Sequence, residues 1–99
     1  MTKRDTIAVG ICYVDGALPE GSSLKDKRRV LRGLIERARA KFNVSVAEVA
    51  HQDLWCRFGL AFSHVSNSPT FSTEALSEVV NWLESQGTFD IVDYSIQVL

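Results

Sequence analysis

Positive side chains gather in one stretch of this 99-residue chain, between Lys25 and Lys41. The stretch holds eight of the eleven Lys and Arg residues and has a net charge of +6, whereas the rest of the chain carries −7. Ammonium and guanidinium groups donate charge-assisted hydrogen bonds to phosphate oxygens. This charge segregation within a nearly neutral protein therefore indicates a polyanionic partner.

A helix predicted over 24–42 places most of these cations on one side, clear of its apolar stripe. The cations on that side are Lys25, Arg28, Arg29, Arg32 and Arg39. Several lie in the first turns, where the helix dipole disfavours positive charge. Together with free backbone N–H groups and the Ser23 hydroxyl they predict an anion site, and a row of such sites suits a phosphodiester backbone. A merely solvated helix face is the alternative, although mixed-sign i,i+4 pairs would then be expected.

A second group of polar and aromatic side chains surrounds the turn of a predicted hairpin, near the start of that helix. Trp55 could stack on a base, and His51 and Asp53 could hydrogen-bond to ribose or base edges. The structural alternatives are a Trp that anchors the hairpin or a dimer contact, an Asp that shapes the turn, and a His with internal partners. The predicted RNA- or phosphate-binding residues are Ser23, Lys25, Lys27, Arg28, Arg29, Arg32, Arg39, His51, Asp53 and Trp55.

Catalytic and metal-binding patterns are weak in this sequence. His64 lies beside Ser63 and Ser66 without the signature of a catalytic triad. The residues around His51 do not have the spacing of a metal site, and no glycine-rich phosphate loop is present. Glu48 and Arg57 are predicted to form a structural cross-strand ion pair. We therefore expect no catalytic residues, no metal and no cofactor.

The elements that position these residues follow from apolar periodicity and turn signals. Strands are predicted over 6–14, 44–51, 54–65 and 89–98, with a second amphipathic helix that ends near Gly87. The order βαββαβ predicts an α+β, ferredoxin-like domain spanning residues 1–99, with an antiparallel sheet in the order 4-1-3-2 and both helices on one face. No apolar stretch approaches the roughly 18 to 20 residues that span a bilayer, so we expect a cytoplasmic protein without membrane contact.

The predicted register assigns a side of the sheet to each strand residue. A two-residue turn at Gln52–Asp53 pairs Glu48 with Arg57 and places Val9 and Ile11 under the helices. Cys12 and Cys56 then point to opposite sides, which argues against a disulfide between them. The open face would offer small residues and favour self-association as a homodimer. These residues are Ala8, Gly10, Cys12, Gly59 and Ala61.

Three segments together resemble the YlxP-like family of small bacterial proteins of unknown function: SLKDKRRVL at 23–31, FNVSVAEV at 42–49 and QDLW at 52–55. The resemblance covers almost the whole chain. It implies a ferredoxin-like fold, a gene often found beside those of translation initiation and ribosome maturation factors, and a role on ribosomal RNA, without defined catalytic residues. Ala50 and Cys56 depart from the pattern, which usually has polar residues there.

The sequence therefore predicts a non-enzymatic RNA-binding module, associated with ribosomal RNA or small-subunit maturation, that uses its basic helix. A protein-interaction or small-ligand regulatory domain, whose basic helix meets an acidic partner, is the alternative. A small phosphatase of the acylphosphatase type is a third candidate, because those enzymes resemble this chain in length and element order. They bind phosphate through an Arg after the first strand, and residues 15–21 contain none.

Overall fold

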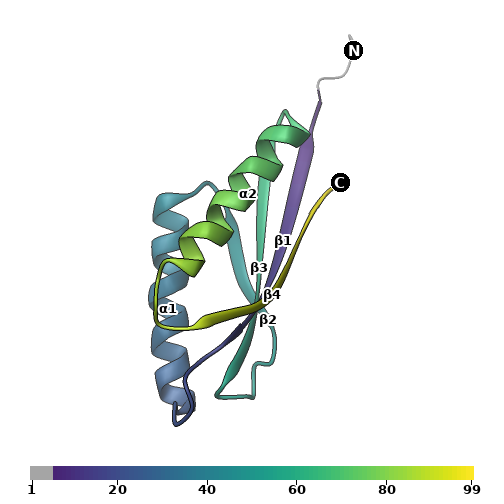
Figure 1. The fold of residues 1–99 in the computed structure, drawn as a ribbon. Coiled ribbons are helices and arrows are strands. Elements are labelled where there is room, and N and C mark those ends of the chain that lie inside the picture. Colours follow the sequence, from purple (N-terminus) through teal and green to yellow (C-terminus); the bar gives the residue numbers. More distant parts are fainter. Residues whose placement is uncertain (1–5) are drawn as a thin grey trace.

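A computed structural model describes residues 6–99, so residues 1–5, with which the predicted domain begins, lie outside the described residues. The elements follow the predicted order β-α-β-β-α-β (Figure 1). They are β1 (Ala8–Ala17), α1 (Leu24–Lys41), β2 (Ser45–Ala50), β3 (Arg57–Ser66), α2 (Pro69–Glu84) and β4 (Asp90–Val98).

The four strands form one antiparallel sheet in the order β2-β3-β1-β4. Counted from the β4 edge this is 4-1-3-2, so the predicted strand order is confirmed. Both helices lie on the same side of the sheet (Figure 1), and a single cluster of buried residues fills the space between the two layers. The fold is α+β and ferredoxin-like, as predicted.

Each helix begins at a serine cap. Ser23 accepts a hydrogen bond from the Asp26 N–H, and the Asp26 carboxylate accepts one from the Ser23 N–H, which completes the capping box that starts α1. Ser68 caps α2, and Pro69 follows at its first turn, where a missing N–H costs nothing. Within residues 6–99, neither helix combines the length and apolarity needed to cross a membrane.

The register predicted for the β2–β3 hairpin is wrong. Ala47 pairs with Ala61 and Glu48 with Leu60, so the strands are joined by the six residues 51–56 rather than by a two-residue turn. His51 begins this connection with a φ of 60°, in the left-handed region that few residues other than glycine adopt. The register shifts by three residues, and an odd shift moves side chains to the other face of a strand.

The predicted faces of β1 are exchanged as well. Ile11 is 37% exposed on the open face of the sheet, away from the helices. Three of the five small residues predicted for the open face, those on β1, lie instead in the buried layer. They are Ala8, Gly10 and Cys12.

The large residues of β3 decide which side of β1 is buried. Phe58 and Phe62 fill the core, and their partners across the ladder, Gly16 and Cys12, lie on the same face as they do. Glycine is required at position 16, because an added Cβ would stand 2.1 Å from the Phe58 ring. Small residues on β1 therefore make room for aromatic residues of β3, a pattern that the apolarity of β1 alone does not reveal.

Both cysteines are free thiols, as predicted. Burial raises the pKa of Cys12 to about 11, so this thiol stays protonated at neutral pH and packs as a small apolar residue. Cys56 is half-buried in the connection between β2 and β3.

Candidate functional site

Four of the predicted phosphate-binding residues flank one hollow on the outer surface of α1. The hollow has a volume of about 240 Å³, and it is lined by Lys25, Arg28, Arg29 and Arg32, which we call the basic strip. These residues follow one another at i, i+3, i+4 and i+7, the spacing that brings side chains to one side of a helix. All four are exposed.

Most of the basic strip has no acidic partner. Arg29 forms an ion pair with Asp26, three residues earlier on the helix. Among residues 6–99, no hydrogen bond or ion pair engages the side chains of Lys25, Arg28 or Arg32. Three cationic heads therefore remain available to an external anion.

The start of α1 is not itself an open anion site. The Ser23 hydroxyl, predicted to bind phosphate, accepts the Asp26 N–H at 3.1 Å, and the Asp26 carboxylate accepts the Ser23 N–H at 2.9 Å. The backbone N–H and the hydroxyl of Ser23 hold the pKa of Asp26 below its usual value, with a contribution from Arg29. The chain thus places its own carboxylate at the positive end of the helix dipole. The candidate site lies along the side of the helix.

Lys27 was predicted to bind phosphate, and the structure contradicts this. Its side chain is 1% exposed, and its Nζ donates to the carbonyl oxygens of His51 and Leu54, each at 2.7 Å. The Gln52 carbonyl oxygen lies 3.4 Å from the same nitrogen, and Glu48 Oε2 lies 2.9 Å from it. An ammonium group has three protons to donate, and these neighbours occupy them. Lys27 therefore fastens α1 to the connection between β2 and β3.

The helical wheel already contained a signal for this role. At 100° per residue, Lys27 falls with Leu31, Leu34 and Ala38, which are the other buried residues of α1. A lysine within an apolar stripe needs partners for its charge. The signal identifies a buried lysine, although it does not say which carbonyl oxygens will meet it.

Arg39 does not line the hollow of the basic strip. Its Nη2 donates to the Val46 carbonyl oxygen at 3.0 Å, which ties the last turns of α1 to the start of β2. The candidate site is accordingly confined to the first half of the helix.

The connection between β2 and β3 does lie against the start of α1, because Lys27 binds two of its carbonyl oxygens. Asp53 and Trp55 are exposed there, Trp55 to 52%. The His51 imidazole turns elsewhere, with its Nε2 3.5 Å from Asp15 Oδ1. The structure thus brings the backbone of this connection to α1 but directs His51 to the sheet.

The predicted ion pair between Glu48 and Arg57 is wrong, because each residue has a different partner. Glu48 meets Lys27, whereas Arg57 Nη2 donates to Asp15 Oδ2 at 2.7 Å. The changed register separates the two strand positions. The hydrogen bond with Asp15 raises the pKa of Arg57, which stays charged. A polar cluster on the open side of the sheet contains Asp15, His51 and Arg57. This cluster could not be predicted without the β1–β3 register, which brings Asp15 and Arg57 together.

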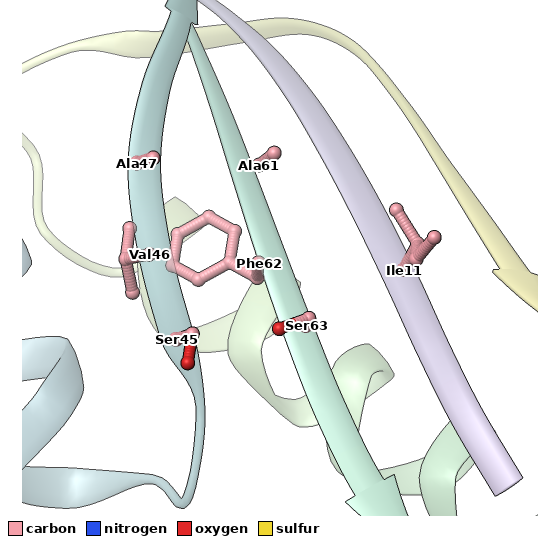
Figure 2. A pocket seen from close by; sticks show the side chains of 7 residues that line it. All are labelled: Ile11, Ser45, Val46, Ala47, Ala61, Phe62 and Ser63. Carbon is pink, nitrogen blue, oxygen red and sulfur yellow. The ribbon is translucent and has the colours of Figure 1, made fainter.

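The open face of the sheet also carries a shallow apolar groove of about 310 Å³ (Figure 2). Ala47 and Ala61 face each other across β2 and β3 on this side, and Ile11 lies on the neighbouring strand β1, whereas the buried Val46 and Phe62 belong to the core on the other side of the sheet. Ala61 belongs to this groove and lies on the open face as predicted. The full lining is Ile11, Ser45, Val46, Ala47, Ala61, Phe62 and Ser63.

Comparison with known proteins identifies a family and a similar protein. The family model described as "Protein of unknown function (DUF503)" matches residues 9–96. The "Uncharacterized protein YlxP" of Bacillus subtilis (strain 168) is 32% identical over 77 residues, which cover 78% of this chain and 84% of that protein.

Proposed function

The chain belongs to the YlxP-like DUF503 family of proteins of unknown function, as its motifs predicted, and on that premise we propose that it is a non-enzymatic RNA-binding module. The observation that supports the proposal is the basic strip. Its four cations surround one hollow, and three of them have no partner among residues 6–99. Each unpaired head can exchange bound water and counterions for a phosphate oxygen.

The composition of the basic strip favours a polyanion over an acidic protein. Protein interfaces combine a polar rim with a central cluster of apolar or aromatic side chains. The residues that line this hollow are all cationic, and the apolar residues of α1 face the sheet. Affinity at such a surface comes mainly from charge, which suits a phosphodiester backbone.

Ribosomal RNA is the ligand that we expect, in the setting of small-subunit maturation, because of the family resemblance described above. The test is fluorescence anisotropy with fragments of small-subunit ribosomal RNA at increasing salt. If all four cations of the basic strip contact phosphates of a duplex region, affinity should fall by about 150-fold between about 50 and 200 mM salt.

Two double variants with the same change in net charge distinguish binding by the basic strip from a general effect of the protein's charge. Arg28→Gln with Arg32→Gln removes two strip cations, and Arg37→Gln with Lys41→Gln removes two exposed cations from another side of α1. The first variant should lower the slope of the salt dependence by about 2, while the second should leave it nearly unchanged. Equal effects of both variants, or no binding that depends on salt, would contradict the proposal.

Self-association is a second candidate function, favoured by the apolar groove on the open face. Ile11 lines this groove and is exposed, and exposed apolar surfaces are typical of sites that bind another chain. A homodimer through this face should appear in light scattering after size-exclusion chromatography, and Ile11→Lys should convert it to a monomer. A monomeric mass for the unmodified protein at high concentration would exclude it.

A further inference from the structure

The hollow of the basic strip is lined without any aromatic side chain. Proteins that bind single strands stack bases on exposed aromatic rings. Among residues 6–99, the large aromatic side chains that are clearly exposed are Trp55, Phe71 and Tyr94, and none of them belongs to α1. Phe42, which caps the end of α1, packs edge-to-face against Trp82. The strip therefore offers phosphate contacts and no stacking surface.

Trp55 does not supply the missing ring to the basic strip. The carbonyl oxygen before it, that of Leu54, is bound by Lys27 on the buried side of α1. At 100° per residue, Lys27 lies roughly 150° around the helix from the centre of the strip. The backbone that precedes Trp55 therefore lies on the side of α1 away from the strip.

The open face of the sheet is not a stacking platform either. On β1 and β3 this face presents one aromatic residue, Tyr13, among aliphatic and small side chains. The Tyr13 hydroxyl lies over Gly59, where an added Cβ would stand 2.6 Å from it. Modules that read single-stranded RNA on a sheet stack two or three bases on aromatic residues of neighbouring strands.

The arrangement of the basic strip matches two rows of phosphates. Lys25 and Arg32 are separated by about 10 Å along the helix axis. Arg28 and Arg29 lie on opposite sides of the hollow, about 100° apart around the helix. The ion pair of Arg29 with Asp26 is exposed, and exposed pairs contribute little free energy, so a phosphate can displace it. In A-form RNA the major groove is narrow and deep, so the phosphates of its two strands face each other across it. A single strand presents only one row.

From these observations we infer that the basic strip binds the backbone of double-stranded, A-form RNA, with cations on either side of the hollow contacting phosphates of opposite strands. The inference rests on the proposed function and specifies its ligand. Side chains cannot read the bases in that narrow groove, so binding depends on helix shape and not on sequence.

The test compares three labelled probes of equal length with the full-length protein. They are an RNA duplex of about 20 base pairs, longer than the roughly 16 that double-stranded RNA-binding domains span, a poly(U) strand, and a DNA duplex of the same sequence. We expect the RNA duplex to bind at least about tenfold more tightly than either of the others, a difference that anisotropy titrations resolve. Its affinity should fall about 150-fold between about 50 and 200 mM salt if four phosphates are contacted.

Variants decide between duplex and single-strand binding. Arg28→Gln with Arg32→Gln should weaken binding to the RNA duplex, whereas the control Arg37→Gln with Lys41→Gln and the variant Trp55→Ala should not. Poly(U) binding that equals or exceeds duplex binding and is lost in Trp55→Ala would overturn this inference while leaving RNA binding intact. Equal binding of the DNA duplex would also overturn it. Absence of salt-dependent binding to every probe would overturn the proposed function as well.

Discussion

Both sides of α1 carry positive side chains, but these side chains are buried and paired on one side and exposed on the other. On the inner side, Lys27 is buried and holds carbonyl oxygens of the β2–β3 connection. On the outer side, its neighbour Arg28 is exposed and has no partner among the described residues. One cation stabilises the fold, and the other is free to bind.

This difference teaches that a run of basic residues cannot be read as one functional unit. Burying a charge is costly unless it is paired and hydrogen-bonded, so a buried lysine has partners built around it. An exposed cation at the surface contributes little to folding. The two roles should separate in experiments that measure stability and RNA affinity on the same variants.

The largest effect should come from Lys27→Met. The change leaves Glu48 without its ion-pair partner and at least two carbonyl oxygens without their donor, and loss of one partner of a buried ion pair costs about 3–5 kcal/mol. Because the Glu48 side chain is 27% exposed, we expect about 3 kcal/mol, measured by urea unfolding.

Lys25→Met is the matched control for this variant and should change stability by less than about 0.5 kcal/mol. Adding Glu48→Gln to Lys27→Met should restore part of the loss, because it removes the stranded carboxylate. A loss below about 1 kcal/mol in Lys27→Met would show that the buried ammonium is not a structural fastener.

A smaller effect is expected from Ser23→Ala at the boundary between the two sides. Loss of the serine cap should cost about 1 kcal/mol of unfolding free energy, whereas Ser23→Gly should cost only a few tenths. RNA affinity should stay unchanged in both variants, because the hydroxyl serves the helix. A drop in RNA affinity without a drop in unfolding free energy would show that Ser23 belongs to the binding surface.

The pH dependence of stability tests the role of Asp26. Its pKa is lowered in the folded state from an ordinary value of 3.8, chiefly by the Ser23 N–H. A carboxyl group whose pKa is lower in the folded than in the unfolded state stabilises the fold at pH values above the unfolded-state pKa. This stabilisation is lost as the pH falls through the folded-state pKa. Unfolding of the unmodified protein should therefore become easier below about pH 4, and Asp26→Asn should lack this component. Parallel profiles for the two proteins would contradict the assignment.

The smallest effect on stability should come from Arg28→Gln with Arg32→Gln, the variant expected to weaken RNA binding most. Both side chains are exposed and unpaired within residues 6–99, so the change in unfolding free energy should stay within about 0.5 kcal/mol. Melting curves of this variant and of Arg37→Gln with Lys41→Gln should overlap. Marked destabilisation of the strip variant alone would show that the outer side also has a structural role.

Much of the fold could be predicted from local signals. The capping box at Ser23 and Asp26 marks the start of α1, and the order of elements restricts the sheet to the strand order that the structure confirms. The cations of the basic strip could also be grouped from the sequence, because the helical repeat determines which residues are neighbours on the helix surface. These features depend on residues close in sequence or on general rules of chain topology.

Other features could not be predicted, because they depend on pairing between distant segments. The faces of β1 follow from the aromatic residues of β3, and the length of the β2–β3 connection follows from Lys27 and the left-handed His51. Apolarity alone assigned Ile11 to the core and Gly10 to the surface, the reverse of the structure. Because the register differs from the predicted one, Glu48 and Arg57 each pair with another residue instead of with one another.

The sequence by itself determined the order of elements, the start of α1 and the concentration of positive charge on that helix, because caps, periodicity and charge are local properties. Only the tertiary structure decided which carbonyl oxygens the buried lysine binds and which face of the sheet is open. Those outcomes depend on which side chains fill the space between helices and sheet, and volume in a packed core is shared among residues far apart in the chain.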